Sequence, residues 1–265
     1  MKYEIQLIRH ATLLVRTQQV SFLVDPMLSP KDAMDPVANA ASSFRIPMVD
    51  LPFDEAWLEE TIRSVDAVLV THLHRDHWDA AAIEKIPKNK PIFCQPTDAA
   101  TIRDKGFTQV TGIELAATWK GISLVRTNGR HGTGEIGDRM GKVSGFILGN
   151  PQGDLYIAGD TIWCEEVAWV LATYQPAIIV VNSGGARFLS GDPITMTADQ
   201  VIQVHKASPD STIVAVHMDT VNHCLEKRSD LRLALRKAGI SNRVLIPEDG
   251  QTIVLSQGTP RSSYL

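Results

Sequence analysis

The chain has 265 residues, of which 44% are hydrophobic and 21% are charged, so it can form a sizeable buried core. Its formal net charge of −4 and the lack of a long basic stretch disfavour a nucleic-acid partner. Three scattered cysteines, a charged N-terminal stretch and no apolar run long enough to span a membrane are typical of a cytoplasmic protein. We therefore expect a small molecule as the partner, and the sequence leaves a homo-oligomer open.

The N-terminal part of the chain alternates apolar and polar residues, as antiparallel strands do. Residues 2–25 predict two or three such strands, with a hairpin turn at Gln18 and Gln19. Residues 26–53 contain five prolines and little periodicity, which predicts a long irregular segment. Because large apolar side chains such as Phe44 and Ile46 lie in this segment, we interpret it as a lid over a binding site.

Helical and strand patterns alternate from residue 54 onward. The predicted helices cover 54–65, 79–86, 97–106, 165–174, 197–207 and 227–239. The predicted strands cover 66–72, 91–94, 121–127, 142–149, 154–160, 177–182, 211–217, 243–248 and 252–256. Thr97 is the expected N-cap of the third helix, Gly106 its end, and Asn150–Gly153 a turn. This order predicts an α/β fold of two packed sheets with helices outside, in a single domain over residues 1–265.

A cluster of histidines and aspartates follows the apolar run DAVLV at the end of a predicted buried strand. His72 and His74 are two residues apart, so their side chains can point the same way from an extended backbone. Asp76 and His77 lie in the turn before the next helix and can face a second ion. Imidazole and carboxylate groups are ligands for zinc, manganese or iron, so the pattern predicts a metal site.

This H-x-H-x-D-H pattern resembles the signature of the metallo-β-lactamase superfamily, whose fold is a four-layer αββα sandwich. Arg9–Thr12, Val24–Pro26 and Asn182–Ala186 extend the resemblance over nearly the whole chain. They are similar to motifs in the branch that contains ascorbate-6-phosphate lactonase and the N-acyl-phosphatidylethanolamine phospholipase D type enzymes.

The resemblance also implies the remaining metal ligands. His131, Asp160 and His217 each lie at the end of a predicted strand or in the loop after one. The implied cofactor is a pair of divalent ions, zinc in the first place, with manganese or iron as alternatives. The implied ligands are His72, His74 and His131 for the first ion, Asp76, His77 and His217 for the second, and Asp160 for both.

Several residues near these motifs keep two interpretations at this point. His223 follows His217 by six residues and is either a substrate contact or a surface histidine. His10 lies near the metals in the family, but a structural histidine fits its position equally well. Asp25 can orient a ligand histidine or form the turn before Pro26.

The resemblance implies a hydrolase that uses a metal-bound hydroxide to cleave a small ester, lactone or phosphoester bond. Two ions roughly 3.5–4 Å apart can lower the pKa of a shared water toward about 7. Asp76, Asp160 and His223 are the predicted catalytic residues, and no G-x-S-x-G nucleophile motif is present. The alternatives are a mononuclear iron oxygenase acting on persulfides, a phosphodiesterase acting on a lipid or nucleotide, and a protein that binds metal for structure only.

Overall fold

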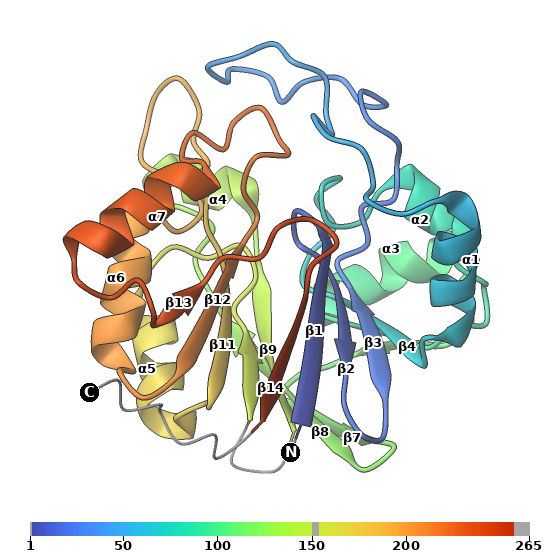
Figure 1. The fold of residues 1–265 in the computed structure, drawn as a ribbon. Coiled ribbons are helices and arrows are strands. Elements are labelled where there is room, and N and C mark those ends of the chain that lie inside the picture. The colour runs from blue at the N-terminus through green and yellow to red at the C-terminus, as the bar shows by residue number, and fades with distance from the viewer. Residues whose placement is uncertain (1, 150–153, 257–265) are drawn as a thin grey trace.

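Two seven-stranded sheets form the centre of the computed structural model, which describes residues 2–149 and 154–256 (Figure 1). The first sheet has the order β14 (Thr252–Ser256), β1 (Lys2–Arg9), β2 (Thr12–Arg16), β3 (Ser21–Val24), β4 (Ala67–Val70), β5 (Ile92–Cys94) and β6 (Val110–Gly112). The second has the order β13 (Val244–Leu245), β12 (Thr212–Val216), β11 (Ile178–Asn182), β10 (Leu155–Ile157), β9 (Ser144–Gly149), β8 (Ile122–Asn128) and β7 (Ala116–Trp119).

Helices cover the outer face of each sheet. The helices are α1 (Glu55–Ser64), α2 (Ala80–Lys85), α3 (Ala99–Asp104), α4 (Gly134–Met140), α5 (Glu165–Tyr174), α6 (Ala198–Ala207) and α7 (Arg228–Lys237), with a 3₁₀ turn at Pro96–Asp98. The apolar faces of α1, α2 and α3 pack on the first sheet, and those of α5, α6 and α7 on the second. Among the residues that the structure describes, no helix is both long and apolar enough to cross a membrane.

The apolar residues of the central strands divide between two cores according to their position along each strand. In β4, Leu69 joins the core between the sheets, whereas Val68 packs beneath the helices. In β11, Val180 faces the other sheet and Ile179 faces α5 and α6. Because successive side chains of a strand point to opposite faces, a strand buried on both faces must be apolar throughout. These continuous apolar runs produce the four layers, and the predicted αββα sandwich is confirmed.

Most predicted elements are present, with a few differences. Thr97 is not the N-cap of a helix: a 3₁₀ turn occupies its position, α3 begins only at Ala99, and the Thr97 hydroxyl donates to Asp98 instead. Strands β6 and β7 and helix α4 were not predicted, because all three are short and β7 is half exposed. The predicted turn at Asn150–Gly153 lies outside the described residues.

The strands direct several loops to one edge of the sandwich. Strands β3 and β4 run parallel, as do β10, β11 and β12, and β8 has the direction of β10 because both are antiparallel to β9. Parallel strands end at the same edge of a sheet. The loops after these strands therefore emerge together, at the top of Figure 1.

The irregular 26–53 segment passes above this edge and is attached at several points (Figure 1). Its two limbs pair through a bridge between Met34 and Ile46. The Asn222 side chain accepts a hydrogen bond from the Val37 N–H at 2.8 Å and donates to the Ser42 carbonyl at 2.7 Å. The segment is thus joined to the loop after β12, which is one of the loops at the edge.

Arg9, at the end of β1, holds both ends of the 26–53 segment. Its side chain is fully buried. The guanidinium donates to the carbonyls of Met27 (3.0 Å), Ser29 (2.7 Å) and Val49 (2.9 Å). Hydrogen bonds from a charged donor are roughly twice as strong as neutral ones, so this single side chain anchors the segment firmly.

Candidate metal centre

The loop after β4 carries the first four residues of the predicted site. The Thr71 N–H and hydroxyl both donate to the Asp25 carboxylate, at 2.7 Å each, which fixes the start of the loop. The His72 Nδ1 lies 3.1 Å from the Thr71 hydroxyl, so its Nε2 points the other way. The N–H of His77 donates to the carbonyl of His74, and the turn then enters α2.

One group of three histidines gathers on one side of the edge. The ligand nitrogens of His72, His74 and His131 lie within 4.8 Å of one another. The His131 Nε2 is 3.3 Å from the His74 Nδ1, while the His131 Nδ1 bonds to the carbonyl of Ile194 at 2.8 Å. That outer hydrogen bond fixes the ring so that the Nε2 faces the group. These are the three residues predicted for the first ion.

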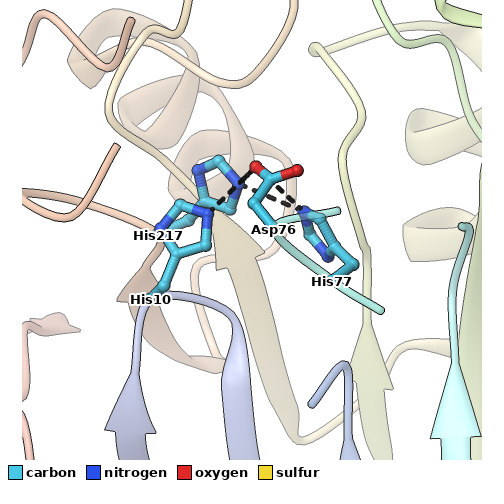
Figure 2. A group of neighbouring side chains, drawn as sticks. All are labelled: His10, Asp76, His77 and His217. Carbon is cyan, nitrogen blue, oxygen red and sulfur yellow. Dashed lines mark hydrogen bonds and ion pairs between the residues drawn. The ribbon is translucent and has the colours of Figure 1, made fainter. Parts of the chain in front are cut away.

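A second group lies beside it and is drawn in Figure 2. It contains Asp76, His77 and His217, predicted for the second ion, together with His10. The His77 Nε2 and the His217 Nε2 are 3.3 Å apart. The Asp76 Oδ2 lies 3.8 Å from the first of these nitrogens, 3.7 Å from the second, and 3.2 Å from the His10 Nε2.

Asp160 lies between the two groups. Its Oδ2 is 3.2 Å from the His77 Nε2 and 3.6 Å from the His131 Nε2, and its Oδ1 is 3.3 Å from the His217 Nε2. The Asn182 amide donates to the Asp160 Oδ1 at 2.7 Å and orients the carboxylate. The strand end can turn sharply here because Gly159 adopts a φ of +69°, where a Cβ would lie 2.7 Å from the Ser144 carbonyl oxygen.

The donor set is suited to binding metal. In the His77–His217 and His74–His131 pairs, two imidazole nitrogens lie 3.3 Å apart. At most one nitrogen of such a pair can carry a proton, so the other keeps its lone pair unprotonated. The His72 Nε2 is buried and has no hydrogen-bond partner within the described parts of the chain. Buried nitrogens without a proton donor are costly unless a cation accepts their lone pairs. Nitrogen and carboxylate ligands of this kind are typical of zinc.

The electrostatics of the cluster favour charged carboxylates and keep His72 and His131 neutral, whereas they favour the protonated form of His77. Burial lowers the pKa of His131 to about 4 and holds that of His72 well below its usual value. Neutral imidazole is the form that binds metal. Burial raises the pKa of Asp160, but His217 and His77 outweigh it, so the carboxyl stays well below its usual pKa. For His77 the order is reversed: burial lowers its pKa, but Asp160 and the other nearby carboxylates raise it well above the usual value. The pocket therefore attracts positive charge.

All seven residues predicted as ligands are brought together by the structure. His223, by contrast, belongs to neither group: it is buried, its ring stacks on Phe188 with centroids 6.2 Å apart, and its Nδ1 has no partner among the described residues. Burial lowers the pKa of His223, and the charge of Asp76 partly opposes this effect, so the ring is within electrostatic reach of the second group. The surface position considered from the sequence is wrong, because only 7% of His223 is exposed.

Other side chains support the ligands, and sequence reasoning identified only some of them. Of the two roles considered for Asp25, the orienting one is present: its Oδ2 accepts from the His77 Nδ1 at 2.9 Å. The contact of Asn182 with Asp160 was missed, although the position of Asn182 at the end of an apolar strand placed it at the same edge. The Cys224 Sγ lies 3.5 Å from the His217 Nδ1, which no sequence pattern indicated.

We expect Asp25→Asn to weaken binding of the second ion by roughly 10–100-fold, the usual effect of removing a carboxylate behind a ligand histidine. The substitution removes the charge that holds the His77 Nδ1–H while keeping the size of the side chain. Titration of metal-free protein with zinc, followed by calorimetry, measures this affinity. Asp54→Asn, at the exposed N-cap of α1, is the matched control. Equal affinities in the two variants would contradict the role given to Asp25.

A cavity opens beside the first group of histidines. Its volume is about 350 Å³. His72 and His74 form one wall, and Gln95, Asp98 and Lys142 are among the polar residues of the others. The cavity has the size of a small-molecule site and one face of it is made by the histidines.

The chain is similar to known proteins over nearly its full length. The family model described as "Beta-lactamase superfamily domain" matches residues 21–218. The UPF0173 protein YddR of Bacillus subtilis is 38% identical over 250 residues, covering 92% of this chain and 97% of the relative.

Two solved structures share this fold closely. One is a possible metal-dependent hydrolase from Veillonella parvula, with a TM-score of 0.91 and 36% identity over 96% of this chain and all of that one. The other is an isothiocyanate hydrolase from Delia radicum gut bacteria, with a TM-score of 0.87 and 37% identity, covering 96% of this chain and 98% of that one. The similarity therefore includes the edge of the sandwich at which the histidines and aspartates meet.

Proposed function

This chain belongs to the metallo-β-lactamase superfamily and is a metal-dependent hydrolase, and from that premise we propose that it uses two ions held by seven side chains. His72, His74 and His131 hold the first ion. Asp76, His77 and His217 hold the second. The observation that carries the proposal is the position of Asp160, whose two oxygens face nitrogens of both groups at 3.2–3.6 Å. A purely structural site is usually closed around one ion by four ligands, which does not match this arrangement.

The protein's own groups prepare the site for hydrolysis. When bound, two such ions lower the pKa of water and polarise the electrophilic group of the substrate. Asn182 orients Asp160, and Asp25 orients His77, so these two ligands are held in place by the protein itself. His223 keeps an unpartnered Nδ1 beside the second group and can exchange a hydrogen bond or a proton with the substrate.

The substrate that we propose is a small ester or lactone, in preference to a phosphoester. The adjoining cavity of about 350 Å³ accommodates a small molecule. Apart from the ion proposed at His72 and His74, its lining contains one cation, Lys142, and one carboxyl, Asp98, so the protein itself adds little positive charge to hold a phosphate. Zinc is the proposed metal because histidine nitrogens dominate the ligand set. Free thiols at all three cysteines support a reducing compartment such as the cytoplasm.

An isothiocyanate is the second candidate substrate. The observation in its favour is the 37% identity with the structure named as an isothiocyanate hydrolase, which extends over 96% of this chain. The central carbon of an N=C=S group is electrophilic, as the carbonyl carbon of an ester is, so an activated water can attack either. Both candidate substrates therefore require the same metal ligands, and they differ in the pocket walls that would fit them.

A screen of the zinc-, manganese- and iron-loaded protein against lactones, carboxylic esters, phosphodiesters and isothiocyanates tests the proposal. We expect turnover to be fastest with a lactone or ester and to fall to background in Asp160→Ala. If the isothiocyanates are turned over fastest, the second candidate replaces the first. Oxygen uptake with a persulfide and no hydrolysis of the panel would instead identify an iron oxygenase and contradict both.

A further inference from the structure

We propose that His10 is a positioning residue, which holds the carboxylate of Asp76 in place without binding the metal itself. The proposal rests on the two-ion site described above. His10 belongs to the Arg9–Thr12 stretch, one of the motifs in the sequence that resemble the family. The proposed hydrolysis uses none of the four residues directly. The side chains of this stretch instead hold the groups that surround the second ion.

The backbone fixes His10 tightly. It is fully buried at the turn between β1 and β2, with a left-handed φ of +61°, a conformation that residues other than glycine adopt at a cost. Its carbonyl accepts the N–H of His217 at 2.9 Å. The turn of the first sheet and the ligand after β12 in the second sheet are thus connected directly.

The ring of His10 bonds to Asp76 at hydrogen-bond distance. The Nε2 lies 3.2 Å from the Asp76 Oδ2, whereas the nearest nitrogens of His77 and His217 are 3.8 and 3.7 Å from the same oxygen (Figure 2). The Nε2–H therefore donates to the carboxylate. The Nδ1 is buried and has no hydrogen-bond partner among the residues described. A proton on the Nδ1 would have no acceptor, so the tautomer with its proton on the Nε2 is favoured.

The hydrogen bond made by the His10 ring argues against a role as a ligand. The rings of His77 and His217 have centroids 5.3 Å apart and Nε2 atoms 3.3 Å apart, so these nitrogens face each other across a point between them. The ring of His10 lies 3.7 Å from that of His217, with an angle of 36° between the planes. The Nε2 that donates to Asp76 carries a proton, so it has no free lone pair for an ion.

Two neighbours of His10 support the same region. The Thr12 hydroxyl donates to the carbonyl of Asp25 at 2.8 Å and accepts the N–H of Met27 at 2.9 Å, which shapes the turn that places Asp25 behind His77. Arg9 holds the 26–53 segment, as described above. One short turn therefore positions Asp76 through His10 and His77 through Asp25.

Two substitutions separate positioning from metal binding. In His10→Gln the amide nitrogen can occupy the place of the Nε2 and donate to Asp76, whereas the shorter side chain of His10→Asn cannot reach it. We expect His10→Asn to weaken binding of the second ion by roughly 10–100-fold and His10→Gln to stay within about threefold of the unmodified protein. His205→Gln, on α6 and away from the cluster, is the matched control.

The measurements are zinc affinity by calorimetry and the visible spectrum of the cobalt-loaded protein. Equal weakening in both variants, with an altered cobalt spectrum in each, would show that His10 is a ligand and overturn the proposal. Unchanged affinity in both variants would show that His10 does not position Asp76. Failure of the unmodified protein to bind two ions would refute the two-ion site itself, which keeps the two failures distinct.

Discussion

Replacing Asp160 with alanine is expected to lower turnover by roughly a thousandfold, the equivalent of about 4 kcal/mol in transition-state stabilisation. Asp160 is the only one of the seven predicted ligands whose two oxygens face both groups of histidines. Its loss affects both ions at once and leaves the Asn182 amide without its acceptor. Steady-state kinetics with the best substrate of the screen, at saturating metal, measures the effect.

Two further variants make this result specific. His223→Ala removes a group that belongs to neither metal group, so we expect it to lose much less activity than Asp160→Ala. Asp104→Ala, at the exposed end of α3, controls for the loss of a carboxylate and should keep full activity. Similar losses in Asp160→Ala and His223→Ala would mean that the second metal site has been assigned to the wrong residues.

Removing the metal is expected to abolish turnover and to lower the melting temperature substantially. A ligand present at a hundred times its Kd stabilises the folded state by about 2.7 kcal/mol, so two such ions contribute about 5 kcal/mol. At roughly 2–4 °C per kcal/mol for a chain of this size, the melting temperature should fall by about 10–20 °C. Calorimetry before and after dialysis against a chelator measures the shift.

Elemental analysis of the purified protein completes the test. We expect close to two transition-metal ions per chain, and restoration of activity when zinc is returned. A protein with all seven ligands intact and no bound metal, or one whose turnover survives chelation, would contradict the proposed chemistry. Activity that returns fully with one ion per chain would show that the second group serves another purpose.

The sequence predicted that these histidines and aspartates come together, because much of the information is local. The pattern from His72 to His77 follows an apolar strand, and His131, Asp160 and His217 likewise follow strands. When those strands run in the same direction, their ends meet at one edge, so a correct prediction of strands and order is enough to bring the residues together. The family resemblance supplied the choice of His131, Asp160 and His217 as ligands, and the pairing of ligands with ions.

Contacts between distant segments could not be predicted in the same way. Asp25 had two interpretations because nothing near it in the chain indicates that His77, fifty-two residues later, would lie 2.9 Å away. Thr97 fits the preference for a helix N-cap, yet the backbone forms a 3₁₀ turn there and the helix begins after it. Helix α4 is short and contains Gly134 and Gly137, so its intrinsic helix propensity is low and its sequence does not indicate a helix.

The attachment of the 26–53 segment through Arg9 has a consequence for how selectivity can change. All three groups that Arg9 holds are main-chain carbonyls, which every amino acid possesses. Side chains between these anchor points can therefore be exchanged while the ends of the segment remain fastened. A library randomised at residues 36–44 would vary the segment above the edge of the sandwich and leave the predicted metal ligands unaltered, which makes this stretch the natural starting point for evolving new substrate preferences.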